Sequence, residues 1–237
     1  MKKRAGFICI GLLAVLSGCG IIGKSPKTEF TNGYYHLKTD NRRQSVYVDI
    51  KDDTLYVHPA QRVNNTIQPD TSKSVIVFQK QLNNQLYPHS SLSKNSFDMD
   101  FLTMPLKFRP GQKQVPNQLN ANLNGALYLG YRTDKFKINY IPNPLKSTNR
   151  TITHYGFSLG IFTGFGNTAM TPTTTGNSIT MEYDGVVWTK GLAGIIAVNN
   201  FTVGLSVGFD NLMDKNRTIW IYESKPWYGL AFGLNLN

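Results

Sequence analysis

The amino-acid sequence predicts an all-β fold, and three observations lead to that prediction. Several segments in the last two-thirds of the chain alternate in character at every residue, as side chains do across the two faces of a β-strand. Glycine and other small residues keep to one face of those segments. Helical periodicity, finally, is missing from the sequence after residue 19.

Residues 201–209 show the alternation most clearly. One face is large and apolar and the other is small or polar, with Phe201, Val203, Leu205, Val207 and Phe209 opposite Thr202, Gly204, Ser206 and Gly208. Segments 122–131, 155–161 and 228–236 repeat the pattern. Glycine destabilises the interior of an ordinary strand, so its repeated use on one face indicates a crowded lumen. The large face must then meet lipid, and the pattern predicts an antiparallel up-and-down membrane β-barrel.

The predicted barrel has about eight strands, with short and long connections at opposite ends. The strands are expected at 74–83, 97–108, 121–133, 135–142, 153–165, 184–198, 201–212 and 226–236. The pair Asn199-Asn200 is typical of a tight hairpin turn. The long connections 166–183 and 213–225 would then lie at the other end, and residues 171–177 are expected to form an exposed loop.

Two local features refine this prediction. A change of parity near Phe101-Leu102 indicates a bulge in the strand at 97–108. Aromatic side chains gather near the predicted strand ends, as in the interfacial girdles of membrane barrels. They are Tyr128, Tyr131, Tyr140, Tyr155, Trp188, Trp220, Tyr222, Trp227 and Tyr228.

A small β-module is expected at residues 28–70, ahead of a barrel that occupies residues 71–237. Residues 45–50 and 54–58 alternate and flank the turn sequence Lys51-Asp52-Asp53, so they predict a hairpin. A two-stranded unit is marginal by itself, and we expect the hairpin to pack on the barrel mouth. The alternative is that it supplies two more barrel strands, making ten.

Residues 1–18 have the form of an export signal. A basic start is followed by an apolar run from Phe7 to Leu16, which is too short to span a bilayer as a helix. The run ends in Leu16-Ser17-Gly18-Cys19, which resembles the lipobox of bacterial lipoproteins. The resemblance implies cleavage before Cys19, acylation of Cys19 and a lipidated tether over residues 19–27. Gly20, in place of aspartate, implies sorting to the outer membrane.

The β-rich body resembles the small outer-membrane β-barrel proteins of Gram-negative bacteria, especially those of the Bacteroidetes type. The resemblance covers roughly residues 74–237 and is most specific in the segment from Pro226 to Leu234. It implies a protein of the cell outer membrane, held there both by the barrel and by the acyl chains on Cys19.

The charge balance indicates which partners to expect. The sequence holds 25 basic and 14 acidic residues, and removal of residues 1–18 would leave 22 against 14, a net charge of +8. No run of clustered basic residues suggests nucleic-acid binding. The expected partners are membrane lipids, at Cys19 and around the barrel exterior, together with lipopolysaccharide or another envelope component.

The sequence offers little catalytic chemistry. The histidines at 36, 58, 89 and 154 are scattered and form no metal-binding motif, so neither a metal nor a cofactor is expected. His154 and Ser158 share one strand face, but four residues separate them by about 13 Å, too far for a hydrogen bond. Asp98 and Asp100, about 7 Å apart on the same basis, are expected to pair with Arg132 or Lys190.

These observations predict a non-enzymatic outer-membrane β-barrel lipoprotein with an envelope-structural, adhesion or interaction role. Two alternatives stay open. One is a lipid-anchored, soluble periplasmic β-barrel whose large apolar face points inward onto a hydrophobic ligand. The other is a lipid-modifying outer-membrane enzyme that uses His154.

Overall fold

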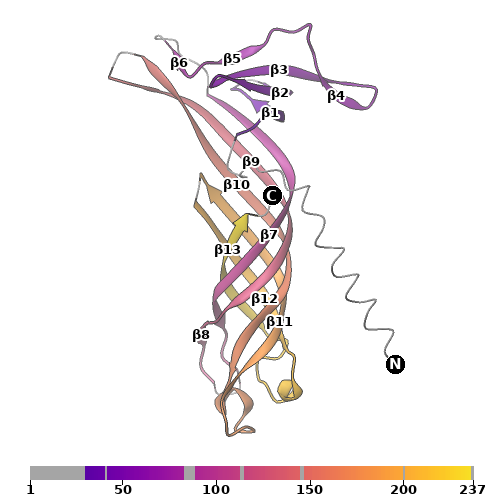
Figure 1. Cartoon of the computed structure of the whole chain (residues 1–237), viewed down its shortest axis with the longest axis vertical. Helices are drawn as coiled ribbons and strands as arrows, with labels where there is room; N and C mark the ends of the chain where they lie inside the picture. Colours follow the sequence, from indigo (N-terminus) through magenta and orange to yellow (C-terminus); the bar gives the residue numbers. More distant parts are fainter. Residues whose placement is uncertain are drawn as a thin grey trace, which may run out of the picture.

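The computed structural model describes residues 30–40, 42–82, 89–112, 115–144, 147–199 and 201–235. This part of the chain is all-β and antiparallel, with two short 3₁₀ turns, η2 (Thr173–Thr175) and η3 (Lys215–Thr218). Figure 1 shows an elongated molecule in which a long ring of strands stands beneath an N-terminal sheet. The predicted all-β class is confirmed.

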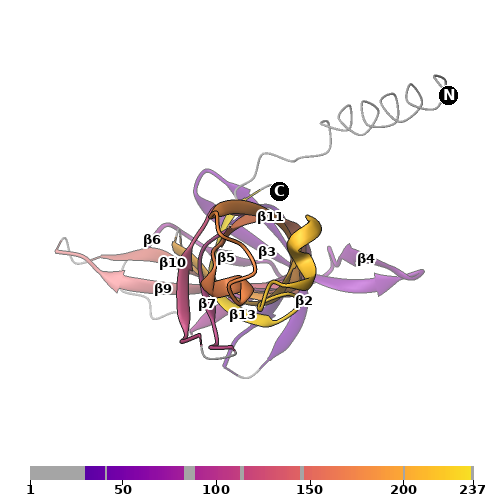
Figure 2. The same cartoon turned by 90° about the horizontal axis from the view of Figure 1, so that it is seen from below.

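Six strands of the described chain close into a ring. They are β7 (Ser90–Arg109), β9 (Asn124–Pro142), β10 (Thr148–Met170), β11 (Tyr183–Val198), β12 (Phe201–Leu212) and β13 (Pro226–Asn235). Each pairs with the next in this order, and β13 pairs back onto β7, so the sheet has no free edge here. The closure is visible along the axis in Figure 2. The short β8 (Gln118–Ala121) pairs with the lower part of β7, below β9.

The N-terminal sheet lies across the upper end of the ring. It consists of β1 (Gly33–Lys38), β2 (Arg43–Lys51), β3 (Thr54–Val63), β4 (Thr66–Pro69) and β5 (Ile76–Phe78). Strand β1 pairs with the upper part of β7, so this sheet continues from the ring. A further short strand, β6 (Gln81–Leu82), pairs with the upper end of β10.

The predicted hairpin is confirmed as β2 and β3, which pair from Val46–Pro59 to Lys51–Thr54. Asp52 and Asp53 turn the chain with φ angles of 47° and 63°, the positive values that a two-residue hairpin turn requires. The hairpin packs through an apolar core onto Leu92, Phe136 and Ile138 of the ring strands. It lies outside the ring, so the ten-strand alternative is wrong.

The strand number in the ring differs from the predicted eight for two reasons. Segments 121–133 and 135–142 belong to one continuous strand, β9, because the polar triplet 133–135 keeps its ladder pairing with β7 and β10. Segment 74–83 contains β5 and β6, which pair outside the ring. The other five predicted strands correspond to β7, β10, β11, β12 and β13.

The predicted bulge in β7 exists but lies a few residues later. Even-numbered residues face inward as far as Met104, and odd-numbered ones do so from Lys107 onward. The pairing of β13 with β7 shifts register at the same place, between Leu230 and Phe232. Pro105 has no backbone N–H to donate to the ladder, which explains why the irregularity falls beside it rather than at Phe101.

Short and long connections lie at opposite ends of the ring, as predicted. The two-residue link between β11 and β12 is at the upper end, where Asn199 adopts a φ of 49° and bonds the His154 backbone. The connections 171–182 and 213–225 are at the lower end. The prediction of an exposed loop at 171–177 is wrong in part, since Thr174 and Thr175 are buried beneath the apolar cluster that closes the lower mouth.

Candidate functional site

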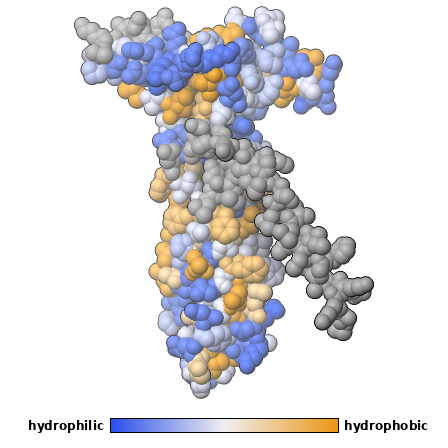
Figure 3. Space-filling model, in the orientation of Figure 1, coloured by the Kyte–Doolittle hydropathy of each residue, from blue (hydrophilic) through white to orange (hydrophobic). Residues whose placement is uncertain are grey.

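An apolar belt surrounds the ring. Its side chains alternate outward along every strand of the ring and are 40–68 % exposed. Figure 3 shows the corresponding hydrophobic surface on the visible face. The predicted direction of the bulky side chains is therefore confirmed. The belt includes Phe97, Phe101, Leu127, Tyr131, Phe157, Leu159, Ile161, Phe165, Val186, Leu192, Ile196, Leu205, Val207, Phe209 and Phe232.

Glycines allow the interior of this narrow ring to be filled by large side chains. A Cβ on Gly160 would lie 2.5 Å from the Gly130 Cα, and one on Gly156 would lie 2.7 Å from the Arg132 guanidinium. Gly194, on the outward parity of β11, has no neighbour closer than 3.9 Å. The crowded lumen expected from the sequence is thus present.

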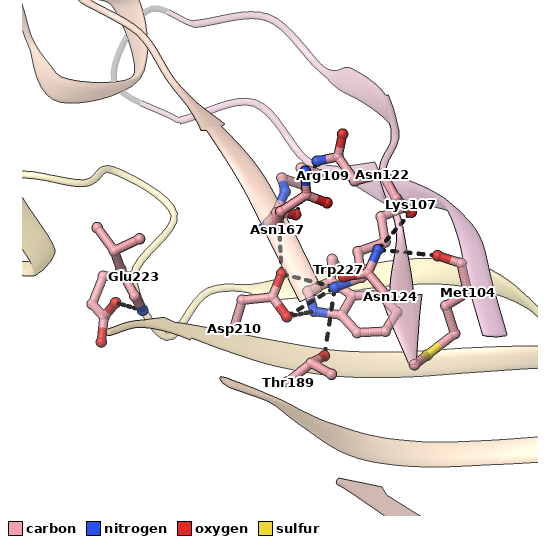
Figure 4. A network of polar contacts seen from close by, with 11 residues as sticks. Met104, Lys107, Arg109, Asn122, Asn124, Asn167, Thr189, Asp210, Glu223 and Trp227 are labelled. Atoms are coloured by element: carbon pink, nitrogen blue, oxygen red, sulfur yellow. Dashed lines mark hydrogen bonds and ion pairs between the residues drawn. The ribbon is translucent and has the colours of Figure 1, made fainter. Parts of the chain in front are cut away.

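A buried ion-pair network occupies the lower half of the ring (Figure 4). The Asp210 carboxylate accepts bonds from Lys107 Nζ at 3.0 and 3.1 Å and from Arg109 Nη2 at 2.5 Å. Trp227 Nε1 also donates to Asp210, at 2.9 Å, and Lys107 Nζ lies 3.5 Å from the Thr189 hydroxyl. All of these groups are almost wholly buried. Such a cluster is stable only when each charge has its partners.

Sequence reasoning missed this network. Lys107 and Arg109 lie at the end of a predicted strand. Because the inward-facing parity of that strand changes at Pro105, the alternation before Pro105 does not predict that these two side chains face inward. Both residues have odd numbers, whereas the inward-facing residues in the first part of this strand have even numbers. This pair of basic residues on the opposite parity is the signal that could have revealed the network. The physical reason for their burial is the closed ring, which brings Lys107 and Arg109 onto the same buried carboxylate of Asp210.

His154 and Ser158, the pair considered for catalysis, have separate partners. His154 Nε2 lies 2.7 Å from Asp134 Oδ1, and the same oxygen accepts a bond from Arg132 Nε at 2.8 Å. The Ser158 hydroxyl is 2.8 Å from the hydroxyl of Tyr128. Both arrangements are buried inside the ring, so the structure does not bring this histidine and serine together.

One expected partner of Asp98 and Asp100 needs revision. Both carboxylates are buried inside the ring. Arg132 is also buried there and bonds Asp134, whereas Lys190 points outward with its Nζ 4.0 Å from the centre of the Trp188 ring. Lys190 is therefore not a lumen residue, and its pairing with these aspartates is wrong.

The aromatic residues divide into two groups. Tyr131, Tyr155, Trp188 and Tyr228 point outward, as a girdle requires. The others are turned inward or packed in the apolar clusters at the two ends, which corrects the prediction for Tyr128, Tyr140, Trp220, Tyr222 and Trp227.

Polarity inverts along three neighbouring strands, although on β10 the change lies four ladder positions above Tyr131, because Tyr155 pairs with Lys135. On β9 the outward residues change from Lys137, Lys135 and Thr133 to Tyr131, while the inward ones change from Phe136 to Asp134. Strand β7 makes the same outward change between Asn95 and Phe97, and β10 between Thr153 and Tyr155. Phe97 and Tyr131 are directly paired across the ladder. The side-chain parity of these strands does not change at the inversion, so it is the apolar and polar side chains that exchange faces there.

Two adjoining hollows lie just above this level. They have volumes of about 480 and 510 Å³ and share Lys38 of β1, Ser91 of β7 and Lys135 of β9. We call their cationic lining the basic groove, defined by Lys38, Arg43, Lys135 and Lys137. All four side chains are exposed.

The remaining predicted sites lie elsewhere. Cys19, the export signal 1–18 and the tether 19–27 fall outside the described residues, so acylation stays a prediction. Among the residues that the structure describes, no three histidine, cysteine or acidic side chains are grouped to hold a metal ion. No helix in the described part is long and apolar enough to cross a membrane.

Comparisons with known proteins return no relative. No protein-family model matches the chain, and neither the curated proteins nor the solved structures contain a significant match. What the protein does must therefore be inferred from its own geometry.

Proposed function

We propose that the six-stranded ring is a transmembrane β-barrel of an outer membrane, anchored additionally by acyl chains on Cys19. The observation that carries this proposal is the inversion of polarity along β7, β9 and β10. Above the level of Tyr131 the chain has apolar side chains inside and polar ones outside, as in water. Below it the outward side chains are apolar, as hydrocarbon requires, and the inside holds buried charged groups beside the apolar cluster around Tyr128.

The height of the apolar belt supports this assignment. On β10 the outward apolar residues run from Tyr155 to Phe165. Ten strand residues extend about 33 Å. At a strand tilt of 35–45° this length spans roughly 25 Å, the height of the apolar band of outer-membrane barrels.

The connections support one orientation. Bacterial barrels place short turns in the periplasm and long connections outside. The link at 199–200 and the end of β13 lie at the same end as the N-terminal sheet, which would put that sheet in the periplasm. Phe30 packs on Phe136, just above the belt. The ten residues between Cys19 and Phe30 can reach about 35 Å, enough to bring acyl chains into the periplasmic leaflet.

The ring interior favours a structural or interaction role over transport or catalysis. Six strands are fewer than the eight of the smallest common bacterial barrels. The lumen of such a ring is filled by side chains, here by the Lys107–Arg109–Asp210 network and an apolar cluster around Tyr128. We therefore propose a non-enzymatic envelope lipoprotein.

The two alternatives are less well supported. A soluble protein that holds a hydrophobic ligand needs an apolar interior, whereas this one carries buried lysine, arginine and aspartate. A lipid-modifying enzyme needs an accessible acid–base pair at a rim, whereas His154 is buried against Asp134.

Fluorescence quenching by brominated lipids tests the membrane assignment. Trp188 points out of the ring at the edge of the belt, whereas Trp220 and Trp227 are buried. The full chain, reconstituted in phosphatidylcholine vesicles with bromine near the headgroup end of the acyl chains, should lose the Trp188 emission. Trp188→Phe should abolish this quenching. Leu205→Trp in that background should restore it, most strongly with bromine deep in the chains.

The contrary outcome is equally clear. If wild-type emission is the same in brominated and ordinary vesicles, and Leu205→Trp is not quenched at any bromine depth, the ring does not lie in the bilayer.

A further inference from the structure

The basic groove gathers four cations, and its lysines differ from the other lysines of the N-terminal sheet in having no acidic partner within the described part of the chain. Elsewhere on that sheet lysines have acidic partners, as in Lys51–Asp49 at 2.8 Å, Lys73–Asp70 at 3.1 Å and Lys80–Asp53 at 2.7 Å. Among the described residues, none of the four groove cations takes part in an ion pair. Asp40 is the only carboxylate among the described residues that line the two hollows. An excess of positive charge gathered in one place attracts an anion.

The groove also presents hydroxyl groups beside these cations. Ser91 and Ser93 line it from β7, and Thr133 lines it from β9. Phosphate oxygens accept several hydrogen bonds at once, from lysine as a compact point charge and from hydroxyl donors. The lining therefore suits a phosphate group better than it suits a single carboxylate.

The position of the groove indicates the source of that phosphate. Lys135 and Lys137 lie on the same outward face of β9 as Tyr131, four and six residues further along the strand. They are therefore just above the apolar belt. Lys137 Nζ lies 5.0 Å from the centre of the ring of Tyr155, the uppermost outward apolar residue of β10. A lipid whose acyl chains cover Tyr131 and Phe157 would hold its headgroup at this level.

From this arrangement we infer that the basic groove binds the phosphate of an anionic phospholipid in the periplasmic leaflet. The inference rests on the proposed membrane assignment and adds a ligand to it. Lys38 from β1 and Lys135 from β9 approach the site from the two regions of the molecule. The bound headgroup would therefore join the N-terminal sheet to the barrel.

Lipid titration of the full chain tests this inference. Binding of dioctanoyl phosphatidylglycerol and of dioctanoyl phosphatidylcholine to the detergent-solubilised protein is measured by native mass spectrometry. Phosphatidylglycerol should bind more tightly. Lys38→Gln with Lys135→Gln should weaken its binding by roughly fivefold per lysine, the contribution of one basic residue near an anionic membrane surface. The matched control, Lys215→Gln with Lys225→Gln at the lower end, removes the same charge and should leave binding unchanged.

Three results would overturn the inference. Equal binding of the two lipids would exclude recognition of the anionic headgroup. Equal weakening by the two double variants would show a general effect of net charge. Complete displacement of the lipid by millimolar inorganic phosphate would identify the ligand as free phosphate.

The titration and the quenching experiment together separate this inference from the membrane assignment. If Trp188 is quenched by brominated lipid while the protein binds phosphatidylglycerol no more tightly than phosphatidylcholine, the groove assignment is wrong and the barrel assignment stands. If Trp188 is not quenched, the barrel assignment fails independently of the titration.

Discussion

The N-terminal sheet and the ring use the same two-residue alternation with opposite results. In the sheet, Val48 and Leu55 point inward and are buried, while Lys51 and His58 meet solvent. In the ring, Leu205 points outward, and the inner face carries charged residues and glycine. Alternation thus identifies a segment as a strand, but it does not by itself show which face lies inside; under the proposed membrane assignment the surrounding medium decides this.

Strand β9 contains both arrangements within one uninterrupted ladder. Its upper part buries Phe136 and Ile138 in the core of the N-terminal sheet, and its lower part buries Arg132 and Asp134 in the ring. Because the backbone pairing is the same in both parts, the comparison isolates the effect of the medium that the proposed membrane assignment gives to each part. The predictions below test it in order of expected effect.

The largest loss of stability is expected from Asp210→Asn. The variant leaves Lys107 and Arg109 buried without their carboxylate, and breaking a buried pair in this way costs about 3–5 kcal/mol. Guanidinium unfolding in detergent micelles measures the change. Asp53→Asn, in the exposed pair with Lys80, is the matched control and should unfold like the wild type. Equal unfolding midpoints for both variants would contradict the structural importance of the network.

A second prediction compares one leucine from each region. Leu55→Ala opens a cavity in the buried core of the N-terminal sheet and should cost about 2–5 kcal/mol. Leu205→Ala lies on the belt, 68 % exposed, and should cost much less because it leaves no cavity in packed protein. The same unfolding assay compares the two. A larger loss for Leu205→Ala would mean that its face packs against protein rather than lipid.

A smaller effect is expected from overpacking the lumen. Gly160→Ala places a methyl group against the backbone of β9, and inserting extra atoms into a packed core costs typically about 1–3 kcal/mol. Gly194→Ala, on the outer face of β11, has open space and should be nearly neutral. Thermal unfolding of the two variants distinguishes them, and equal destabilisation would argue against a crowded interior.

The smallest effect concerns the pH dependence of the N-terminal sheet. The Ser72 side chain, followed by Lys73, holds the pKa of Asp70 below its ordinary value. A depressed carboxyl pKa contributes stability above the unfolded value of about 3.9, and this contribution is lost as the pH falls through the folded pKa. Ser72→Ala should raise the Asp70 pKa in an NMR titration. An unchanged titration would show that the Ser72 bond does not stabilise the carboxylate.

The sequence predicted those parts of the fold where alternation is uninterrupted. Residues 201–212 form a strand with the predicted bounds, and the positive φ angles of Asn199 and of Asp52 and Asp53 follow from local turn chemistry. These features depend only on neighbouring residues. The ring strands with outward bulky faces were therefore accessible without a structure.

The features that the sequence did not reveal depend on position relative to a boundary. Thr133-Asp134-Lys135 has the composition of a turn, yet it lies within β9 where the polarity of the two faces inverts. The buried Thr174 likewise looks like a loop residue until the lower mouth is closed around it. The cations of the basic groove come from β1, β2 and β9, and its hydroxyl groups come from β7 and β9, so the groove joins residues that are distant in sequence. Local patterns could not join them.

The most direct test of the account is the accessibility of two labels on the outward face of β9. Single cysteines at Tyr131→Cys and Lys135→Cys, in a chain without other cysteines, would carry spin labels in reconstituted vesicles. We expect molecular oxygen, which concentrates in hydrocarbon, to relax the label at 131 more strongly than a water-soluble nickel complex does. The label at 135 is only four residues away, and there the nickel complex should relax the label more strongly than oxygen does. If both labels prefer the nickel complex, the outer face of the ring meets water throughout, and the central claim is contradicted.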